Sequence, residues 1–249
     1  MTEQVTGEDK DQPSGASTKN VDPSAKQAQR HKPGSFGELI QASPGQSVLR
    51  WLWWHLLRGV CWLWFKIFFR WRVHNGHRFP RTGAVLIVAN HQSFLDPIAV
   101  GLATGARPMC SLARSSLFKG PLSWVYHSVN TIPVERGKSD TKAMRICLDV
   151  LKNGYPLVLF PEGTRSKDGQ VGEFKGGIML MIKRAKPTVI TLAIDGSHDT
   201  WPANRKLPKL FGKVTGYWGE PIEAETLLAM SNTEALELLR GQVVDLMKK

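Results

Sequence analysis

The chain has 249 residues, of which 42% are hydrophobic, so it has room for one folded domain with a substantial core and a tail. Its formal net charge is +12 and its pI is about 9.8, which favours anionic partners: nucleic acid, acidic lipid headgroups or phosphorylated substrates. The three cysteines, Cys61, Cys110 and Cys147, lack the paired spacing of a zinc site or a disulfide framework. We therefore expect reduced thiols facing the cytosol and no metal.

Residues 1–45 are rich in Ser, Gln, Lys, Asp, Gly and Pro and poor in large apolar side chains. This composition cannot offset the entropy that a chain loses on ordering, so it predicts a disordered tail. The first residues are polar and include acids, which argues against a secretory signal and favours a tail in the cytosol.

The second segment, residues 46–73, contains six of the nine tryptophans, interleaved with Arg, Lys and His. Arg58 and Lys66 interrupt the roughly 20 apolar residues that a membrane crossing needs. On a helix the cations would occupy about half of the surface, with Trp51, Trp54 and Trp62 among them. We predict an amphipathic helix lying on the cytoplasmic face of a membrane, monotopic or peripheral. The alternative is a core helix whose tryptophans pack against the domain.

Residues 74–249 alternate apolar and amphipathic segments, the pattern of an α/β domain whose central mixed sheet is flanked by helices. Strands are predicted over residues 84–89, 108–113, 131–134, 156–160, 188–194 and, at a sheet edge, 213–218. Helices are predicted over residues 97–104, 115–125 and 139–152. A final amphipathic helix begins with a capping box formed by Ser231 and Glu234.

The sequence NHQSFLD, Asn90 to Asp96, lies where a buried strand ends and a helix begins, a position at which α/β proteins expose reactive groups. Asp96 followed by Pro97 predicts a helix start with Asp96 as the N-cap. The turn could also bring the Asp96 carboxylate to one ring nitrogen of His91, leaving the other to accept a proton from a hydroxyl. Alone, such a pair is more often a hydrogen-bonded histidine and an ordinary cap.

Two further motifs end in arginine: IPVERG, Ile132 to Gly137, and FPEGTRS, Phe160 to Ser166. The planar guanidinium can donate two hydrogen bonds to one phosphate, and Gly163 would let the backbone approach a ligand. The alternative for each arginine is a solvated surface charge.

Together, the three motifs resemble the H-x-x-x-x-D glycerolipid acyltransferases, the family that includes 1-acyl-glycerol-3-phosphate acyltransferase. The resemblance runs from Arg72 to Ile222 and ends in the segment GEPI, Gly219 to Ile222. It implies transfer of an acyl group from an acyl thioester to the hydroxyl of lysophosphatidic acid, giving phosphatidic acid. Another lysophospholipid or lipid acceptor is the alternative. No cofactor is implied, and acyl-CoA or acyl carrier protein would bring the acyl group.

The same resemblance assigns roles to individual residues. His91 would be the general base and Asp96 its orienting partner. Arg136 and Arg165 would bind the acceptor phosphate. Glu162 and Gly163 would shape the substrate site, although Glu162 could instead be a structural acid paired with a nearby cation.

One position departs from the family pattern, because Thr191 follows Val189 and Ile190 where relatives commonly have proline. We expect a local change there that affects the substrate pocket rather than the reaction type. The sequence allows two other classes of function. Nucleic-acid binding fits the charge, but the chain has no recognised nucleic-acid motif. An inactive membrane-binding scaffold has no positive support, because His91, Asp96, Arg136 and Arg165 are all present.

Overall fold

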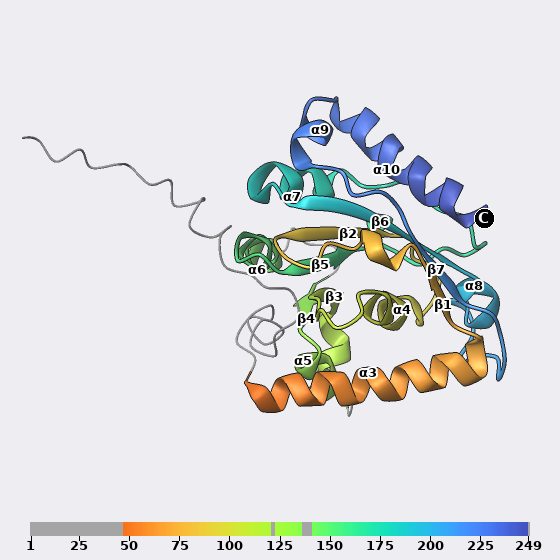
Figure 1. Cartoon of the computed structure of the whole chain (residues 1–249). Helices are drawn as coiled ribbons and strands as arrows, with labels where there is room; N and C mark the ends of the chain where they lie inside the picture. Colours follow the sequence, from red (N-terminus) through yellow and green to blue (C-terminus); the bar gives the residue numbers. More distant parts are fainter. Residues whose placement is uncertain (1–46, 121–122, 136–140, 249) are drawn as a thin grey trace, which may run out of the picture. The chain divides into compact units, whose positions relative to one another are not determined.

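The computed structural model describes residues 47–120, 123–135 and 141–248; the predicted tail, residues 1–45, lies outside them. A five-stranded sheet forms the centre of this part of the chain (Figure 1), with the strand order β1-β7-β6-β2-β5. Only β6 and β7 pair antiparallel, so the sheet is mixed, as the sequence predicts. The strands are β1 Arg72–His74, β2 Val85–Ala89, β5 Pro156–Leu159, β6 Thr188–Asp195 and β7 Thr215–Trp218.

A small second sheet pairs β3, Ser111–Arg114, with β4, Thr131–Val134, in parallel. It lies beside the main sheet, because Cys110 forms an isolated bridge to Leu157 of β5. Between its strands the chain forms a 3-10 helix, Ser115–Lys119, and α5, Ser123–Ser128. The single helix predicted over residues 115–125 is therefore two shorter pieces.

Helices cover both faces of the main sheet. Alternate residues of β2 point to opposite sides of the sheet, and all of them are buried. Leu86 and Val88 belong to one core cluster and Ile87 to the other. The first core lies under α6 Thr141–Lys152, α7 Gly177–Ala185, α9 Ala224–Leu228 and α10 Asn232–Met247 (Figure 1). The second lies under α4, Asp96–Ala103, and the long helix α3, Val48–Phe69.

Helix α3 packs on the domain along one side only. Phe65 and Phe69 are fully buried in the second core, whereas an apolar stripe on the helix is exposed, with members three or four residues apart. The stripe consists of Leu49, Leu52, Leu56, Val60, Leu63 and Ile67. Over the residues described, no helix combines the length and apolarity needed to cross a bilayer.

Two details of the Trp-rich segment differ from the prediction. Trp54, expected among the cations at headgroup level, is only 6% exposed and lies against Gly101 of α4. The helix ends at Phe69 rather than Val73, because Arg70 adopts a left-handed conformation and the chain then enters β1. Helix α3 is therefore apolar on two opposite sides. The side with Trp54, Phe65 and Phe69 is buried against the domain, and the stripe on the other side is exposed.

The C-terminal part confirms the predicted capping box: Ser231 accepts a hydrogen bond from the Glu234 N–H, and Glu234 accepts one from the Ser231 N–H. The strand predicted over residues 213–218 is present as β7, but its placement at the sheet edge is wrong, because β1 lies outside it. Helix α7 was not predicted. Thr191 lies in the middle of β6, where its hydroxyl donates to the side-chain carbonyl of Gln242 in α10.

Candidate active site

The strand β2 delivers His91 to the carboxyl end of the sheet, and α4 begins five residues later at Asp96. The His91 Nδ1 atom lies 2.9 Å from Asp96 Oδ2. The Asp96 side chain is fully buried, whereas that of His91 is 19% exposed. Because Nδ1 faces a carboxylate, we assign the ring proton to Nδ1, which leaves Nε2 as the basic nitrogen.

Asp96 also organises the loop before α4, but not as the predicted N-cap. Its Oδ2 accepts hydrogen bonds from the backbone N–H groups of Gln92, at 2.6 Å, and Ser93, at 2.7 Å. Leu95 is the N-cap, and Asp96 is the first helical residue, followed by Pro97. The cap prediction is wrong because the tight turn lets the carboxylate reach back to the loop instead of forward to the helix.

The segment FPEGTRS holds His91 from three sides. The Phe160 ring stacks on the imidazole, with centroids 4.3 Å apart and planes inclined by 23°. Glu162 Oε1 accepts a 2.7 Å hydrogen bond from the His91 N–H. The Ser166 N–H donates to the His91 carbonyl oxygen at 2.7 Å. The two motifs, about 70 residues apart in sequence, therefore form one unit.

Glu162 is a buried acid whose two carboxylate oxygens meet backbone N–H groups. Oε1 binds His91, and Oε2 accepts from the Gly172 N–H at 3.1 Å. Burial raises the pKa of Glu162 above its usual value, while these two hydrogen bonds act in the opposite direction. The geometry matches the structural alternative for Glu162, with backbone N–H groups in place of a cation.

Gly163 allows a turn that another residue would strain. Its φ is +72°, and its N–H closes the turn by donating to the Phe160 carbonyl oxygen. A Cβ here would come within 2.9 Å of Lys175 Nζ. The glycine therefore serves the turn that carries Glu162 and Arg165.

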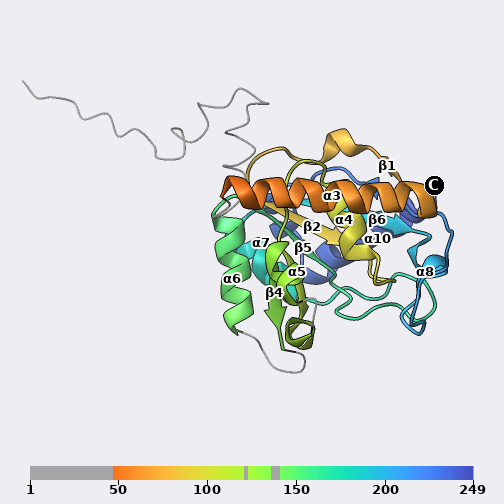
Figure 2. The same ribbon diagram turned by 90° about the horizontal axis from the view of Figure 1, so that it is seen from below.

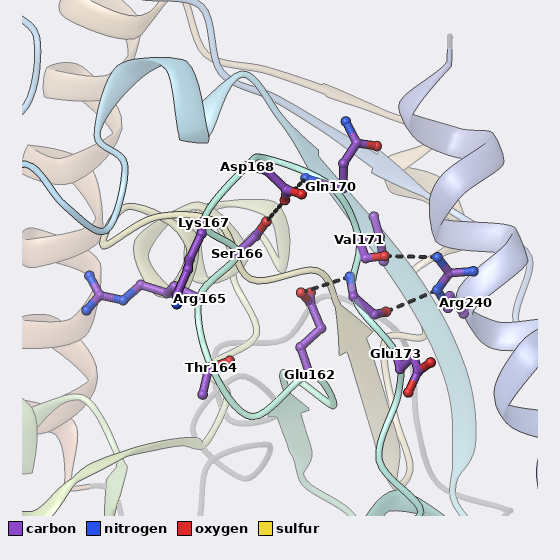
Figure 3. A pocket seen from close by; sticks show the side chains of 11 residues that line it. Glu162, Thr164, Arg165, Ser166, Lys167, Asp168, Gln170, Val171, Glu173 and Arg240 are labelled. Atoms are coloured by element: carbon purple, nitrogen blue, oxygen red, sulfur yellow. Dashed lines mark hydrogen bonds between the residues drawn. The ribbon is translucent and has the colours of Figure 1, made fainter.

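Arg165 reaches back to the first motif. Its guanidinium carbon lies 3.6 Å from the centroid of the Phe94 ring, a cation–π contact, and Phe94 in turn contacts Trp201. Figure 3 shows Arg165 extending from the loop on the side opposite to Arg240. The other predicted phosphate ligand, Arg136, lies outside the described residues.

A cavity of about 500 Å³ opens on the inner side of the 162–173 loop (Figure 3). Glu162 lines it, but His91 and Asp96 do not. Arg240 of α10 closes one side by donating to the carbonyl oxygens of Val171 and Gly172. His91 is therefore not part of the lining of this cavity, although its N–H binds the lining residue Glu162.

Sequence reasoning did not assign roles to Asn90, Phe94, Ser166, Gly172 and Arg240. Asn90 makes a two-way amide contact with the backbone of Ile194, which ties β2 to β6 at the site. The available signal in the sequence was a polar residue that directly follows an apolar strand and begins the motif. Arg240 had none, because a single arginine on an amphipathic helix resembles any surface cation.

The acyltransferase family model matches residues 70–195, which include all three motifs. The chain belongs to the acyltransferase family. The chain is 29% identical over 148 residues to the chloroplastic 1-acyl-sn-glycerol-3-phosphate acyltransferase LPAT1 of Arabidopsis thaliana; the alignment covers 58% of the chain and 41% of that protein. It is 25% identical to the 1-acyl-sn-glycerol-3-phosphate acyltransferase of Streptococcus pneumoniae, over 68% of the chain and 62% of that protein. The matches thus span less than two thirds of these relatives.

The chain shares its fold with a crystal structure from Thermotoga maritima, the 1-acyl-sn-glycerophosphate acyltransferase PlsC. The TM-score is 0.65 over 85% of both chains, at 24% sequence identity. The α/β architecture around His91 is thus that of the acyltransferase fold.

Proposed function

We propose that the protein transfers an acyl group from acyl-CoA or acyl carrier protein to the free hydroxyl of lysophosphatidic acid, giving phosphatidic acid. The observation that carries this proposal is the His91–Asp96 contact, which leaves Nε2 as the basic nitrogen beside a loop that bears Arg165. The names of the matched relatives support the choice of acceptor. Another lysophospholipid or lipid acceptor is the alternative.

The chemistry follows from the histidine. Nε2 takes the proton of the acceptor hydroxyl, and the oxygen attacks the thioester carbonyl to form a tetrahedral intermediate. The C–S bond then breaks, the ester remains, and the imidazolium returns its proton to the departing thiolate. Asp96 stabilises the imidazolium between these steps and keeps the ring in place. The sequence of steps requires no metal or redox cofactor.

The acceptor phosphate is assigned to Arg165 and Arg136. The contact of the Arg165 guanidinium with the ring of Phe94, a residue between His91 and Asp96 in the chain, supports this role, because it places the cation beside the motif of the proposed base. Glu162 and Gly163 complete the site by shaping the loop that carries Arg165. Arg136 follows β4, and its assignment comes from the family motif alone.

We also propose that residues 46–73 attach the enzyme to the cytoplasmic face of a membrane without crossing it, next to an acyltransferase domain of residues 74–249. The exposed apolar stripe of α3 supports this location, because such a surface would otherwise face water. Replacing Leu56, Val60, Leu63 and Ile67 together by Ser should release the protein into the soluble fraction. Retention on lipid at high salt would exclude α3 as the main anchor.

The decisive assay supplies the purified enzyme in lipid vesicles with acyl-CoA or acyl carrier protein thioesters and a panel of lysolipids. Phosphatidic acid and free thiol should form in equal amounts, fastest with lysophosphatidic acid. His91→Ala should abolish both products. Faster acylation of a zwitterionic lysolipid would favour the alternative acceptor, and thiol release without lipid product would indicate a thioesterase.

A further inference from the structure

The segment between α8, Ser197–Thr200, and β7 exposes large apolar side chains away from the site already described. We refer to residues 204–213 as the basic-apolar loop. Leu207 is 73% exposed, Leu210 68% and Phe211 62%, values among the highest for large apolar residues in the described chain. The same loop exposes four cations: Arg205, Lys206, Lys209 and Lys213.

The exposure is built into the backbone, because the loop is tied down at several points. The Lys209 N–H donates to the Thr200 carbonyl oxygen at 2.9 Å, and the Gly212 N–H donates to that of Phe68 at 2.9 Å. Gly212 packs tightly, since a Cβ there would lie 2.5 Å from Thr200 Oγ1. The leucines therefore sit on a defined turn that holds them in water.

The loop packs against the C-terminal end of α3, to one side of the exposed stripe. Phe211 stacks on Phe68 near the end of the helix, with ring centroids 5.7 Å apart and planes inclined by 26°. Phe68 directly follows Ile67, the last member of the stripe, which is 56% exposed, so the two side chains lie about a quarter of a turn apart around the helix. In Figures 1 and 2 the chain after α8 runs beside the C-terminal end of α3.

We propose that the basic-apolar loop is a second bilayer contact, in which Leu207, Leu210 and Phe211 insert among lipids and the cations bind anionic headgroups. Charge complementarity selects this partner, because no Asp or Glu occurs between Asp199 and Glu220. Interleaved lysines and large apolar side chains suit the membrane–water interface, where apolar groups enter the lipid and the ammonium groups stay among the headgroups. Nucleic acid would use the cations and leave the leucines in water.

A second contact has a consequence for orientation. A helix lying on a surface can roll about its own axis, because any exposed stripe tolerates some rotation. The loop lies to one side of α3 (Figure 2), so attachment at both places fixes the roll of the domain. The inference rests on the proposed membrane location, and it adds that the domain presents one fixed side to the lipid.

The test measures binding of the full chain to phosphatidylcholine vesicles, with and without phosphatidylglycerol, by co-sedimentation. Leu207→Ser, Leu210→Ser and Phe211→Ser together should weaken binding to both vesicles by at least on the order of tenfold. Lys206→Gln and Lys209→Gln should weaken binding only to the anionic vesicles, by about fivefold per lysine. The matched control is Leu180→Ser with Leu238→Ser, which changes exposed leucines on α7 and α10 at the opposite face.

A depth measurement separates this proposal from that for α3. A nitroxide attached to Leu210→Cys, in a Cys61→Ser background, should lose contact with water-soluble relaxers on vesicle-bound protein, whereas one at Leu238→Cys should not. A water-exposed label at position 210 on bound protein overturns the second contact and leaves the α3 proposal intact. If the fourfold α3 variant binds normally and the loop variants do not, the α3 proposal fails and the loop proposal stands. Unchanged binding of all loop variants also overturns the proposal.

Discussion

Glu162 Oε1 accepts a 2.7 Å hydrogen bond from the backbone N–H of His91, so the carboxylate holds the main chain of the proposed base. The other oxygen binds Gly172, and a Cβ at that glycine would lie 3.2 Å from it. A buried acid between two N–H groups aligns the 162–173 loop with the end of β2. We therefore propose that Glu162 positions His91.

Glu162→Gln tests this role, because the glutamine carbonyl can satisfy only one of the two N–H groups and its amide would face the other donor. Turnover should fall by on the order of 10- to 100-fold, the scale of a small displacement of a catalytic group. The KM for lysophosphatidic acid should change little. A large rise in KM with normal turnover would instead indicate a direct contact between Glu162 and substrate.

The pH dependence of stability provides an independent check on the buried state of Glu162. Burial raises its pKa in the folded protein, so the folded state binds the proton more tightly than the unfolded state does. Its favourable contribution is complete below the unfolded pKa and is lost as pH rises through the folded pKa. The stability advantage of wild type over Glu162→Gln should therefore shrink with rising pH in urea titrations. An advantage that grows with pH would contradict a raised pKa.

Arg240 should influence catalysis from a distance, because it holds the loop whose Gly172 N–H binds Glu162. Its Nε lies 3.1 Å from the Gly172 carbonyl oxygen, and one terminal nitrogen lies 3.0 Å from that of Val171. Arg240→Met should lower turnover several-fold, and Arg240→Lys should restore little, because an ammonium cannot span both carbonyl groups. Steady-state kinetics at saturating acceptor provide the measurement. Full activity of Arg240→Met would show that turnover does not depend on the contacts of Arg240 with Val171 and Gly172.

The fold was largely predictable because its signals are local. Apolar runs and β-branched residues predicted β2, β5 and β6 to within one residue at each end, and the Ser231 capping box lies within four residues. Helix α3 was harder, because it is apolar on two sides. Whether Trp54 faces lipid or α4 depends on a partner that periodicity does not reveal.

The site divides in the same way. His91 and Asp96 are five residues apart, so one turn brings them together and the sequence predicts the contact. The partners of Glu162, by contrast, are set by tertiary structure, since His91 lies 71 residues away along the chain. The contact of Arg240 with Gly172 spans 68 residues. Local sequence patterns therefore predict the His91–Asp96 contact, but they do not predict the long-range hydrogen bonds of Glu162 and Arg240 that support it.

Arg165→Ala should weaken the use of lysophosphatidic acid far more than that of an uncharged acceptor. The expected loss in kcat/KM is on the order of 10- to 100-fold, the scale of a hydrogen bond to a charged group. Phe94→Leu should cause part of the same selective loss, because it removes the ring under the guanidinium. Phe94→Tyr keeps an aromatic ring there and should retain wild-type use of lysophosphatidic acid. Arg136→Ala should behave like Arg165→Ala. Equal losses on both acceptors would indicate that these arginines stabilise the fold and do not bind the acceptor phosphate.

Asp96→Asn separates the electrostatic role of Asp96 from its role in the loop. The asparagine carbonyl can still accept from the N–H groups of Gln92 and Ser93, but it carries no charge to stabilise an imidazolium. Its amide would take the place of Oδ1, a buried atom without a hydrogen-bond partner among the residues that the structure describes. The melting temperature should therefore fall by only a few degrees, about the effect of 1 kcal/mol in a domain of this size.

Turnover of Asp96→Asn should fall much further, by on the order of 10³ to 10⁴, the scale seen when a catalytic histidine loses its carboxylate. His91→Ala should lose at least as much, and the double variant little more than the worse single one, because residues that act as a unit are not additive. Circular dichroism melts and thiol release, measured on the same preparations, provide the comparison. Near-normal turnover of Asp96→Asn would contradict the dyad and leave His91 to act alone, with Asp96 serving only to fold the loop between β2 and α4.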